Sequence, residues 1–297
     1  MSSGVPSISL CIPAYNAERF VRTAIESCLQ QRMAPFEVIL SDNASSDGTP
    51  AILQDYAGQP NVRVHLQQEH LGIGGHYRRL VSIAGGSHVV CLSADDALHP
   101  GFMGLVRREL GQHPDLGMLA FGGFICDRWM RPVSRFGLGY PRGVMPAPQG
   151  FFHFAKSCTY VMSGAVWQRE ELASLPALPA EAGLSTDWFW ALMAGLHGSL
   201  KLCHTPAVYY RMHEANSSHS DPRRWRRHAE RMLSFMVEAG ASPEAQKEVA
   251  AMSLRLKAGE SAAVEGREPV AGVTVRLRGL LKRFLARCYF RHPQYLR

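Results

Sequence analysis

The sequence contains no apolar stretch that approaches the roughly 18 residues a membrane-spanning helix needs. No basic segment followed by an apolar one stands at its N-terminus, so a secretory signal is not expected and the predicted location is cytoplasmic. Seven cysteines are scattered without Cys-x-x-Cys spacing, which favours buried free thiols over disulfides or a zinc site. The 297 residues lack repeats and low-complexity segments, and their 46% apolar content predicts a folded globular chain.

Several motifs of common enzyme classes are also missing. The chain has neither the Gly-Lys-Ser/Thr end of a phosphate-binding loop nor a Gly-x-Ser-x-Gly elbow. The segment Gly72–Gly75 begins like a dinucleotide fingerprint, but Tyr77 occupies the sixth position, where that motif requires glycine. These absences argue against P-loop nucleotidases, α/β-hydrolases and NAD-dependent enzymes.

Positive charge is concentrated in the last quarter of the chain. Residues 1–221 contain 16 Lys and Arg against 18 Asp and Glu, whereas residues 222–297 contain 16 against 7. This asymmetry predicts a domain over residues 1–221 and a basic, mostly helical region over residues 222–297. No nucleic-acid recognition module accompanies the charge, so nucleic acid is not an expected partner. Residues 273–291 form an amphipathic basic pattern, which either contacts an anionic membrane surface or packs on the protein or a second subunit.

Strand and helix patterns alternate over the first hundred residues. Short apolar runs indicate strands, and apolar residues spaced three or four apart indicate helices. The predicted strands are Ser7–Ile12 (halted by Pro13), Phe36–Leu40, Val62–Leu66 and Ser87–Leu92, and the predicted helices are Glu18–Gln31, Thr49–Tyr56 and Gly75–Ala84. The short loops between them predict an α/β fold with a mostly parallel central sheet flanked by helices.

The pattern becomes less regular after residue 100. Residues 100–148 are rich in Gly, Pro and Arg, which predicts loops that shape a pocket. A helix is expected to begin near Thr186 and a short strand to span Ala207–Tyr210. The region beyond Asp221 is expected to be mostly helical and to form a C-terminal appendage.

Two adjacent carboxylates, Asp95 and Asp96, follow the strand that ends at Leu92. Parallel strands deliver their C-terminal residues to the ligand crevice of an open sheet. Neighbouring carboxylates repel one another unless a cation lies between them and an anionic ligand, so the pair indicates a divalent metal that clamps a phosphate group. The alternative is a turn in which aspartate only caps the following segment.

Five segments together resemble the family 2 glycosyltransferases of the GT-A fold. They are Pro13-Ala14-Tyr15-Asn16, the loop Asp42–Thr49, Gly72–Gly75, the Ala84-Gly85-Gly86 turn and Leu92-Ser93-Ala94-Asp95-Asp96. The resemblance covers about residues 7–215. It implies transfer of a sugar, with inversion and with Mn²⁺ or Mg²⁺, from a nucleotide diphosphate donor, expected to be a UDP-sugar. The implied acceptor is a hydroxyl group of a glycan or of a lipid-linked acceptor at the inner face of the membrane, in polysaccharide or lipid-linked glycan assembly.

The resemblance assigns nucleotide-binding roles to residues at the first two strand ends. Tyr15 would line the base, with Pro13 shaping the turn, and Asp42 would accept a hydrogen bond from the base or ribose. Asp42 has a structural alternative, since an Asx-turn at this position would open the loop to the next helix.

The same resemblance assigns the ribose to Asp95 and the metal to Asp96. Many relatives have a third aspartate where this chain has Ser93, so the carboxylate motif is reduced here. Arg78 and Arg79 occupy positions near the base or diphosphate in relatives, although both could instead belong to a solvated helix face.

The acidic residue Asp187 corresponds to the general base of the family. It stands in Leu184–Trp190, where the family has a Glu-Asp pair and this chain has Thr186-Asp187. Trp188 and Trp190 could supply an apolar wall that raises the pKa of the carboxylate. The alternative role is a cap at the start of the helix, which is compatible with catalysis.

Two further segments complete the comparison with the family. Gly164 would let a strand pass beneath the transferred sugar, or would only permit close packing. In Tyr209–His213, Arg211 would pair with phosphate and His213 would bind the metal or the diphosphate, while a structural histidine is the alternative. A catalytically inactive sugar-nucleotide-binding protein with the same fold is the competing function.

Overall fold

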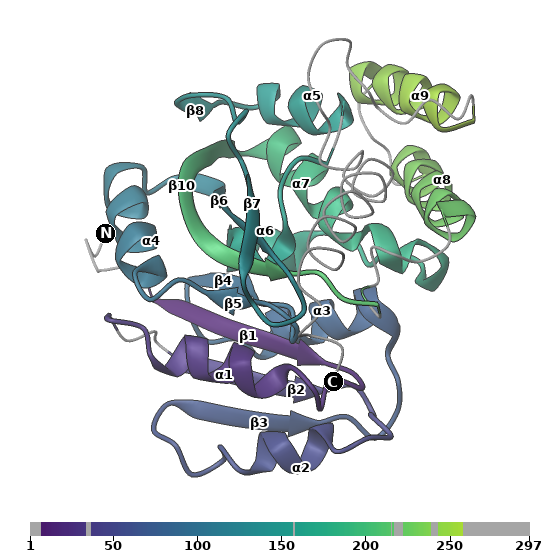
Figure 1. Cartoon of the computed structure of the whole chain (residues 1–297). Coiled ribbons are helices and arrows are strands. Elements are labelled where there is room, and N and C mark those ends of the chain that lie inside the picture. The colour runs from purple at the N-terminus through teal and green to yellow at the C-terminus, as the bar shows by residue number, and fades with distance from the viewer. Residues whose placement is uncertain are drawn as a thin grey trace, which may run out of the picture.

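The computed structural model describes residues 7–33, 37–156, 158–214, 216, 222–238 and 243–257. These residues form a ten-stranded sheet in which eight strands follow the order β3-β2-β1-β4-β9-β6-β10-β5, while β7 pairs with β6 and β8 with β10 (Figure 1). The strands are β1 (Ile8–Ala14), β2 (Glu37–Asp42), β3 (Val62–Leu66), β4 (His88–Cys91), β5 (Ala97–Leu98), β6 (Leu116–Cys126), β7 (Pro132–Phe136), β8 (Val144–Met145), β9 (Ala165–Gln168) and β10 (Ser199–Arg211).

Strand direction confirms the predicted mostly parallel sheet. Strands β1 to β4 pair in parallel, and β10 pairs in parallel with β6. Strand β9 runs antiparallel between β4 and β6, so these two flanking strands point the same way. The carboxyl ends of β1, β2, β4, β6 and β10 therefore lie toward one edge of the sheet, where a ligand crevice is expected.

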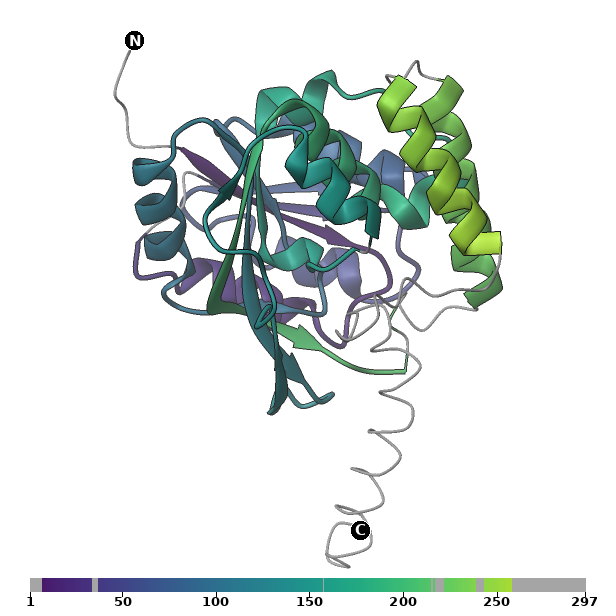
Figure 2. The same ribbon diagram turned by 90° about the horizontal axis from the view of Figure 1, so that it is seen from above.

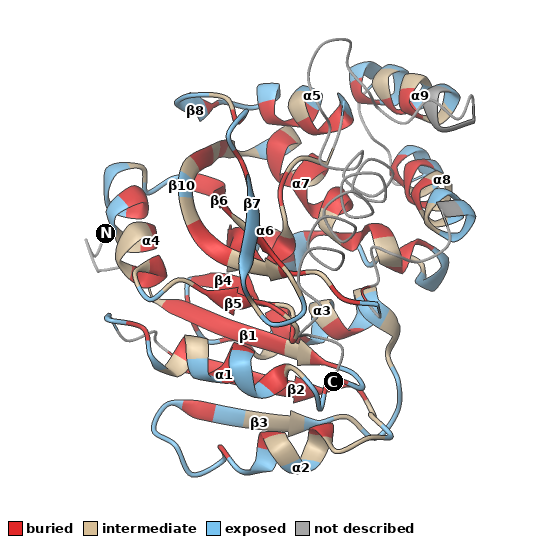
Figure 3. Cartoon of the chain, viewed as in Figure 1, coloured by how far each residue is buried: buried red, intermediate tan, exposed pale blue. Residues whose placement is uncertain are grey.

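Helices cover both faces of the sheet. They are α1 (Val21–Leu29), α2 (Thr49–Gln54), α3 (Gly72–Ile83), α4 (Phe102–Gln112), α5 (Gln149–Lys156), α6 (Arg169–Ser174), α7 (Thr186–His197), α8 (Pro222–Glu238) and α9 (Pro243–Lys257), with short 3₁₀ helices η1 (Met162–Gly164) and η2 (Ala180–Ser185). One apolar core joins the sheet to α1, α2 and α4, and a second joins it to α3, α5, α6, α7, α8 and α9. The burial pattern in Figure 3 follows this layering, with the strands β1 and β4 almost wholly buried.

The first hundred residues follow the sequence-based prediction with small differences at the ends of elements. Strand β1 does not stop before Pro13 but continues to Ala14. The N–H of Leu92 donates to the carbonyl of Cys11, so Pro13, two residues further on, faces the side where β4 has already ended. A proline in that position deprives no neighbouring strand of a hydrogen bond.

The prediction of loops over residues 100–148 was wrong. This region contains α4, the eleven-residue β6 and the strands β7 and β8. The glycines of β6 suggested a loop, but they are required by packing, because a Cβ atom at Gly122 would lie 2.8 Å from the carbonyl oxygen of Phe136. The predicted strand Ala207–Tyr210 is the end of the longer β10, whose register shifts around Pro206.

Close packing at Gly123 predicts a large stability loss on substitution. An added Cβ would overlap the carbonyl oxygen of Val208 and lie 2.7 Å from a methyl carbon of that residue. Gly123→Ala is therefore expected to lower the free energy of unfolding by about 2–3 kcal/mol, measured by urea denaturation. Gly58→Ala is the matched control, since no atom lies within 4 Å of its Cβ position. Equal stability of the two variants would contradict this account of β6.

Helices α8 and α9 confirm the helical prediction for the described part of residues 222–257, and they pack beside one another on the outside of the molecule (Figure 2). Trp225 of α8 stacks on Trp188 of α7, with ring centres 5.7 Å apart. The described part of this region therefore shares a core with the preceding domain, and the division at residue 221 stays a prediction. The amphipathic segment 273–291 lies outside the described residues. Within the described ranges, no helix is both long and apolar enough to cross a membrane.

Candidate active site

The loop after β1 presents an exposed aromatic ring at the carboxyl edge of the sheet. Tyr15 is 51% exposed, and its ring meets that of His70 edge-on at 4.6 Å. The next residue, Asn16, has a left-handed backbone (φ 48°), which asparagine tolerates better than most residues. The main-chain N–H of Asn16 donates to the hydroxyl of Ser45, which joins this loop to the loop after β2. His70 was missed in the sequence, since no pattern there linked it to Tyr15.

Asp42, the last residue of β2, combines the two roles considered for it. Its side chain is 2% exposed, and Oδ2 accepts a hydrogen bond from the N–H of Ser45 at 2.9 Å, as in a turn. Its other oxygen, Oδ1, is buried and has no hydrogen-bond partner among the described residues. An unpaired buried carboxylate oxygen is costly, and a ligand N–H would satisfy it.

Asp95 and His213 meet across 118 residues of sequence. The Nε2 atom of His213 lies 3.0 Å from Oδ2 of Asp95, and Asn216 donates to the same oxygen at 3.0 Å. The Asp95 side chain keeps 26% of its surface exposed, whereas that of His213 is 4% exposed. The sequence reading missed Asn216, although it follows the Tyr209–His213 motif by only a few residues. The structure thus brings together two of the expected ligand-binding residues, with Asp95 facing outward.

Asp96 lies beneath Asp95 and is fully buried. Its Oδ2 accepts a hydrogen bond from the hydroxyl of Ser163 at 2.5 Å, and its Oδ1 accepts one from the main-chain N–H of Arg211 at 2.9 Å. Burial and the neighbouring Asp95 carboxylate raise the pKa of Asp96 well above its ordinary value, and the two hydrogen bonds oppose this shift. Asp96 thereby ties β10 and η1 to the end of β4.

The guanidinium group of Arg211 fixes the main chain around the acidic pair. Its Nε donates to the carbonyl of Asp95 at 2.8 Å, and its Nη1 donates to the carbonyl of Arg128 at 3.3 Å. It also lies 4.8 Å from the ring centre of Phe20, which contacts the His213 ring at 4.3 Å. The remaining Nη2 is buried without a partner among the described residues and could reach an anionic ligand.

Asp187, the second residue of α7, has a carboxylate suited to accepting a proton. Burial raises its pKa to about 6, and the hydrogen bond from the N–H of Trp188 at 2.7 Å opposes this shift. Tyr160 donates to the Asp187 main-chain carbonyl at 2.6 Å. The side chain of Trp188 points away, donating to the carbonyl of Phe154 and stacking on Trp225. Of the two tryptophans expected to form an apolar wall, Trp188 therefore points elsewhere, whereas Trp190 contacts Tyr77 and Trp167.

A cluster of aromatic rings lies behind Asp187. Tyr77 contacts Trp190, Trp190 contacts Trp167, and Trp167 contacts Tyr160, each pair with ring centres 5.8 Å apart. The pKa of Tyr77 is raised by burial and, to smaller extents, by the charges of Asp187 and Asp95. Both carboxylates are therefore near enough to Tyr77 to influence its pKa.

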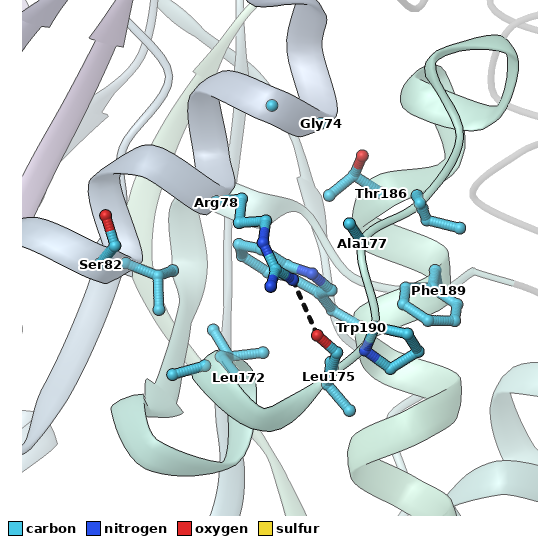
Figure 4. Close-up of a pocket in the computed structure, with 14 residues that line it drawn as sticks. Gly74, Arg78, Ser82, Leu172, Leu175, Ala177, Thr186, Phe189 and Trp190 are labelled. Atoms are coloured by element: carbon cyan, nitrogen blue, oxygen red, sulfur yellow. Dashed lines mark hydrogen bonds between the residues drawn. The ribbon is translucent and has the colours of Figure 1, made fainter.

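For Arg78, Arg79 and Gly164, three of the expected site residues, the structure shows surroundings that do not indicate the nucleotide-binding role predicted for them. Arg78 donates to the carbonyl of Leu175 at 2.8 Å in a pocket lined by Leu172, Thr186 and Trp190 (Figure 4). Arg79 is exposed on the same helix. A Cβ atom at Gly164 would lie 2.9 Å from the carbonyl oxygen of Phe121, so this glycine is required by packing. The nucleotide-binding roles of these three residues stay predictions.

The chain matches the family model described as Glycosyl transferase family 2 over residues 9–170, more than half of its length. It belongs to this family. A 106-residue segment is 38% identical to the chondroitin synthase of Escherichia coli and covers 35% of this chain and 15% of that protein. The hyaluronan synthase of Pasteurella multocida is 31% identical over 106 residues, which cover 35% of this chain and 11% of that protein. The chain thus corresponds to a small part of each of these relatives.

Similarity to solved structures extends over most of the chain. The structure of S. aureus TarS 1–349 in complex with UDP-GlcNAc has a TM-score of 0.65 and 16% identity, covering 85% of this chain and 73% of that one. The mannosyltransferase PcManGT from Pyrobaculum calidifontis, in complex with GDP-Man and Mn²⁺, has a TM-score of 0.58 and 17% identity, covering 94% and 81%. At these identities the similarity shows the fold, and it confirms the predicted GT-A architecture.

Proposed function

We propose that this protein is an inverting glycosyltransferase that moves a sugar from a nucleotide diphosphate to a hydroxyl acceptor in polysaccharide or lipid-linked glycan assembly. The observation that carries the proposal is the edge where β1, β2 and β4 end. It combines an exposed ring (Tyr15), an unpartnered buried oxygen (Asp42 Oδ1) and an outward-facing carboxylate beside an imidazole (Asp95 and His213). Such a set suits a flat base, its N–H group and, through a divalent cation, a diphosphate.

The family resemblance implies a divalent ion, and the donor atoms of this site suit one. Among the described residues, no cluster of three or more His, Cys, Asp or Glu side chains could hold a metal by itself. Asp95 Oδ2 and His213 Nε2, 3.0 Å apart, would provide two ligands and leave the other positions to diphosphate oxygens and water. Bound Mn²⁺ or Mg²⁺ would neutralise charge on the leaving diphosphate. The family resemblance implies that Asp96 is the metal ligand. We assign that role to Asp95 instead, because Asp96 is buried beneath it.

Asp187 would act as the single general base. As a carboxylate it would accept the proton of the acceptor hydroxyl, and its pKa of about 6 leaves it ionised near neutral pH while keeping it basic enough to act. Tyr160, a member of the aromatic cluster, holds the main-chain carbonyl of Asp187 and so fixes the start of α7. Inversion is part of the proposal because the family resemblance implies it, and a single general base is what an inverting transfer needs.

A UDP-sugar is the proposed donor, and calorimetry with UDP, GDP and dTDP, each with and without Mn²⁺, tests it. The likeness to TarS, whose structures include complexes with UDP and UDP-GlcNAc, supports UDP, whereas PcManGT holds GDP-Man. Metal-dependent binding of one nucleotide would identify the base. Absence of binding by all three, with the protein demonstrably folded, would contradict the proposal. Metal-dependent binding without turnover of any donor–acceptor pair would favour the inactive sugar-nucleotide-binding protein.

Replacing the exposed ring provides a specific prediction for the base site. Tyr15→Ala is expected to weaken nucleotide binding about tenfold or more, because base–aromatic stacking contributes about 1–3 kcal/mol. Tyr15→Phe is the matched control, since it keeps the ring and should retain most of the affinity. Calorimetry on both variants measures the difference. An equal loss of nucleotide affinity in Tyr15→Ala and Tyr15→Phe would show that the hydroxyl group, not the face of the ring, contacts the nucleotide.

A further inference from the structure

Arginine and aromatic side chains are concentrated on the hairpin formed by β6 and β7. Every residue of β7 except Phe136 is exposed (Figure 3), and the hairpin projects from the body of the molecule (Figure 2). Trp129, in the turn of the hairpin, is 58% exposed, and the guanidinium groups of Arg128 and Arg131 lie 5.4 and 5.3 Å from its ring centre. Large exposed aromatic side chains with arginine side chains beside them are typical of binding surfaces.

A second group of planar side chains lies on the strands of the hairpin and on β10. The His99 and Tyr209 rings lie 6.2 Å apart, and Tyr209 stacks on Phe124 at 5.5 Å. The guanidinium of Arg135 lies 5.8 Å from the centre of the Phe124 ring, as the β6–β7 register requires. We call the surface formed by His99, Phe124, Trp129, Arg131, Arg135 and Tyr209 the hairpin platform.

The turn of the hairpin is attached directly to the proposed donor site. Arg211, whose Nε donates to the carbonyl of Asp95, also donates from Nη1 to the carbonyl of Arg128. The side chain of Arg128 lies 4.0 Å from the carboxylate of Glu214, next to His213 in the sequence. A molecule bound at this turn would therefore lie close to residues proposed to hold the donor.

We propose that the hairpin platform binds the acceptor, and that this acceptor is an anionic glycan carrying carboxylate or phosphate groups. This inference rests on the proposed glycosyltransferase function. Arginine presents a planar fork that pairs with both kinds of anion, and aromatic faces provide apolar area against which the C–H faces of sugar rings pack. The platform offers both, repeated along a strip that crosses three strands, which suits an extended chain of charged sugars.

The chemistry of the turn favours a glycan over a membrane surface. Oδ1 of Asp127 accepts hydrogen bonds from the N–H groups of Trp129 and Arg131, so a carboxylate is built into the turn. A segment that inserts into a bilayer would expose several apolar side chains at its tip, whereas Trp129 is the large exposed one among residues 127–131.

Binding of three dextrans of equal length tests the proposal: neutral dextran, carboxymethyl dextran and phosphorylated dextran. The native protein is expected to bind one or both anionic dextrans more tightly than the neutral one, and the tighter of the two identifies the anion. The double variant Arg131→Gln/Arg135→Gln is expected to lose about tenfold in that affinity, since two charge-assisted contacts are removed. Trp129→Ala should lose a similar factor for the same ligand. Arg32→Gln/Arg142→Gln, with the same change in charge elsewhere, is the matched control and should bind as the native protein does.

Nucleotide binding measured on the same samples separates this inference from the proposed function. All variants are expected to keep native affinity for the nucleotide, since none replaces a residue proposed to hold it. Loss of nucleotide binding in the native protein would contradict the donor site, whatever the dextrans show. Equal affinity for the three dextrans, or equal binding by the platform and control variants, would overturn the platform. Vesicles of phosphatidylglycerol and phosphatidylcholine provide the last comparison: if the platform variants lose vesicle binding but keep dextran binding, the surface is a membrane contact and the proposal is wrong.

Discussion

Replacing Asp187 by asparagine is expected to slow sugar transfer by about 10²–10⁴-fold, the range that general base catalysis contributes. The variant should leave donor binding unchanged, because Asp187 lies at the start of α7 and not among the residues proposed to hold the nucleotide. Asparagine can still accept the hydrogen bond that the N–H of Trp188 donates, so the helix start should persist. Transfer rates measured with saturating donor, together with calorimetric affinity for the nucleotide, would establish the loss.

The pH dependence of transfer provides a second test of Asp187. Its pKa is raised to about 6 by burial, and only the ionised form can accept a proton. The rate is therefore expected to fall about tenfold for each pH unit below 6 and to level off above it. Below the inflection the carboxylate is protonated, so the sign of the effect is a loss on acidification. The asparagine variant should show no inflection near pH 6.

Glu181→Gln is the matched control for both measurements. Glu181 is an exposed acid in η2, close in sequence to Asp187 but outside the aromatic cluster. The Glu181→Gln variant should retain the native transfer rate and the native pH profile. If Asp187→Asn transferred sugar at the native rate, Asp187 would be a helix cap only, and another group would have to accept the proton.

The convergence of the strand ends could be predicted from the sequence. The family resemblance assigned roles to Tyr15 and Asp42, and the parallel pairing of β1 and β2 brings the loops after these strands together through Asn16 and Ser45. Asp95 and His213 are far apart in sequence, yet β4 and β10 both end at this edge. The alternation of strand and helix therefore predicts which strand ends lie at one edge of the sheet.

The orientation of side chains within the site could not be predicted in the same way. Which of two adjacent aspartates faces outward depends on the turn after β4, where the N–H of Asp96 donates to the carbonyl of Ser93. It also depends on Ser163, which holds Asp96 from a segment distant in sequence. The wall expected around Asp187 differs in one residue for a related reason. Trp188 is next to Asp187 in sequence, but successive residues of a helix point in different directions, so Trp188 stacks on Trp225 while Trp190 contacts Tyr77.

The structure of β6 shows a different limit of sequence patterns. Glycine in an apolar segment suggests a turn when it is considered alone. In β6, Gly122 and Gly123 allow β7 and β10 to approach from the two sides, and this requirement exists only once those strands are in place. The hairpin that carries Trp129 was therefore placed in a loop region, and the expectation that residues 100–148 shape a pocket stays a prediction.

Separate alanine substitutions of Asp95 and Asp96 are expected to affect different properties. Asp96→Ala should lower the free energy of unfolding by about 3 kcal/mol, because a buried hydroxyl and a buried main-chain N–H lose their acceptor. These donors belong to Ser163 and Arg211, neither of which has solvent to replace the lost carboxylate. Asp95→Ala should cost about 1 kcal/mol or less, since the Asp95 side chain is partly exposed and its partners can be hydrated.

Metal-dependent nucleotide binding should show the opposite order. Asp95→Ala removes the outward-facing carboxylate beside His213, so Mn²⁺ should no longer raise the affinity for the nucleotide. Asp96→Ala, measured at a temperature where urea denaturation shows it to be folded, should retain a Mn²⁺ effect, weakened to the extent that Arg211 and Asp95 shift. If a folded Asp96→Ala variant bound the nucleotide equally well with and without Mn²⁺, Asp96 would be the metal ligand, as the family resemblance first implied. The expected pattern would instead show that one carboxylate of the pair faces the ligand because the other is held by the protein.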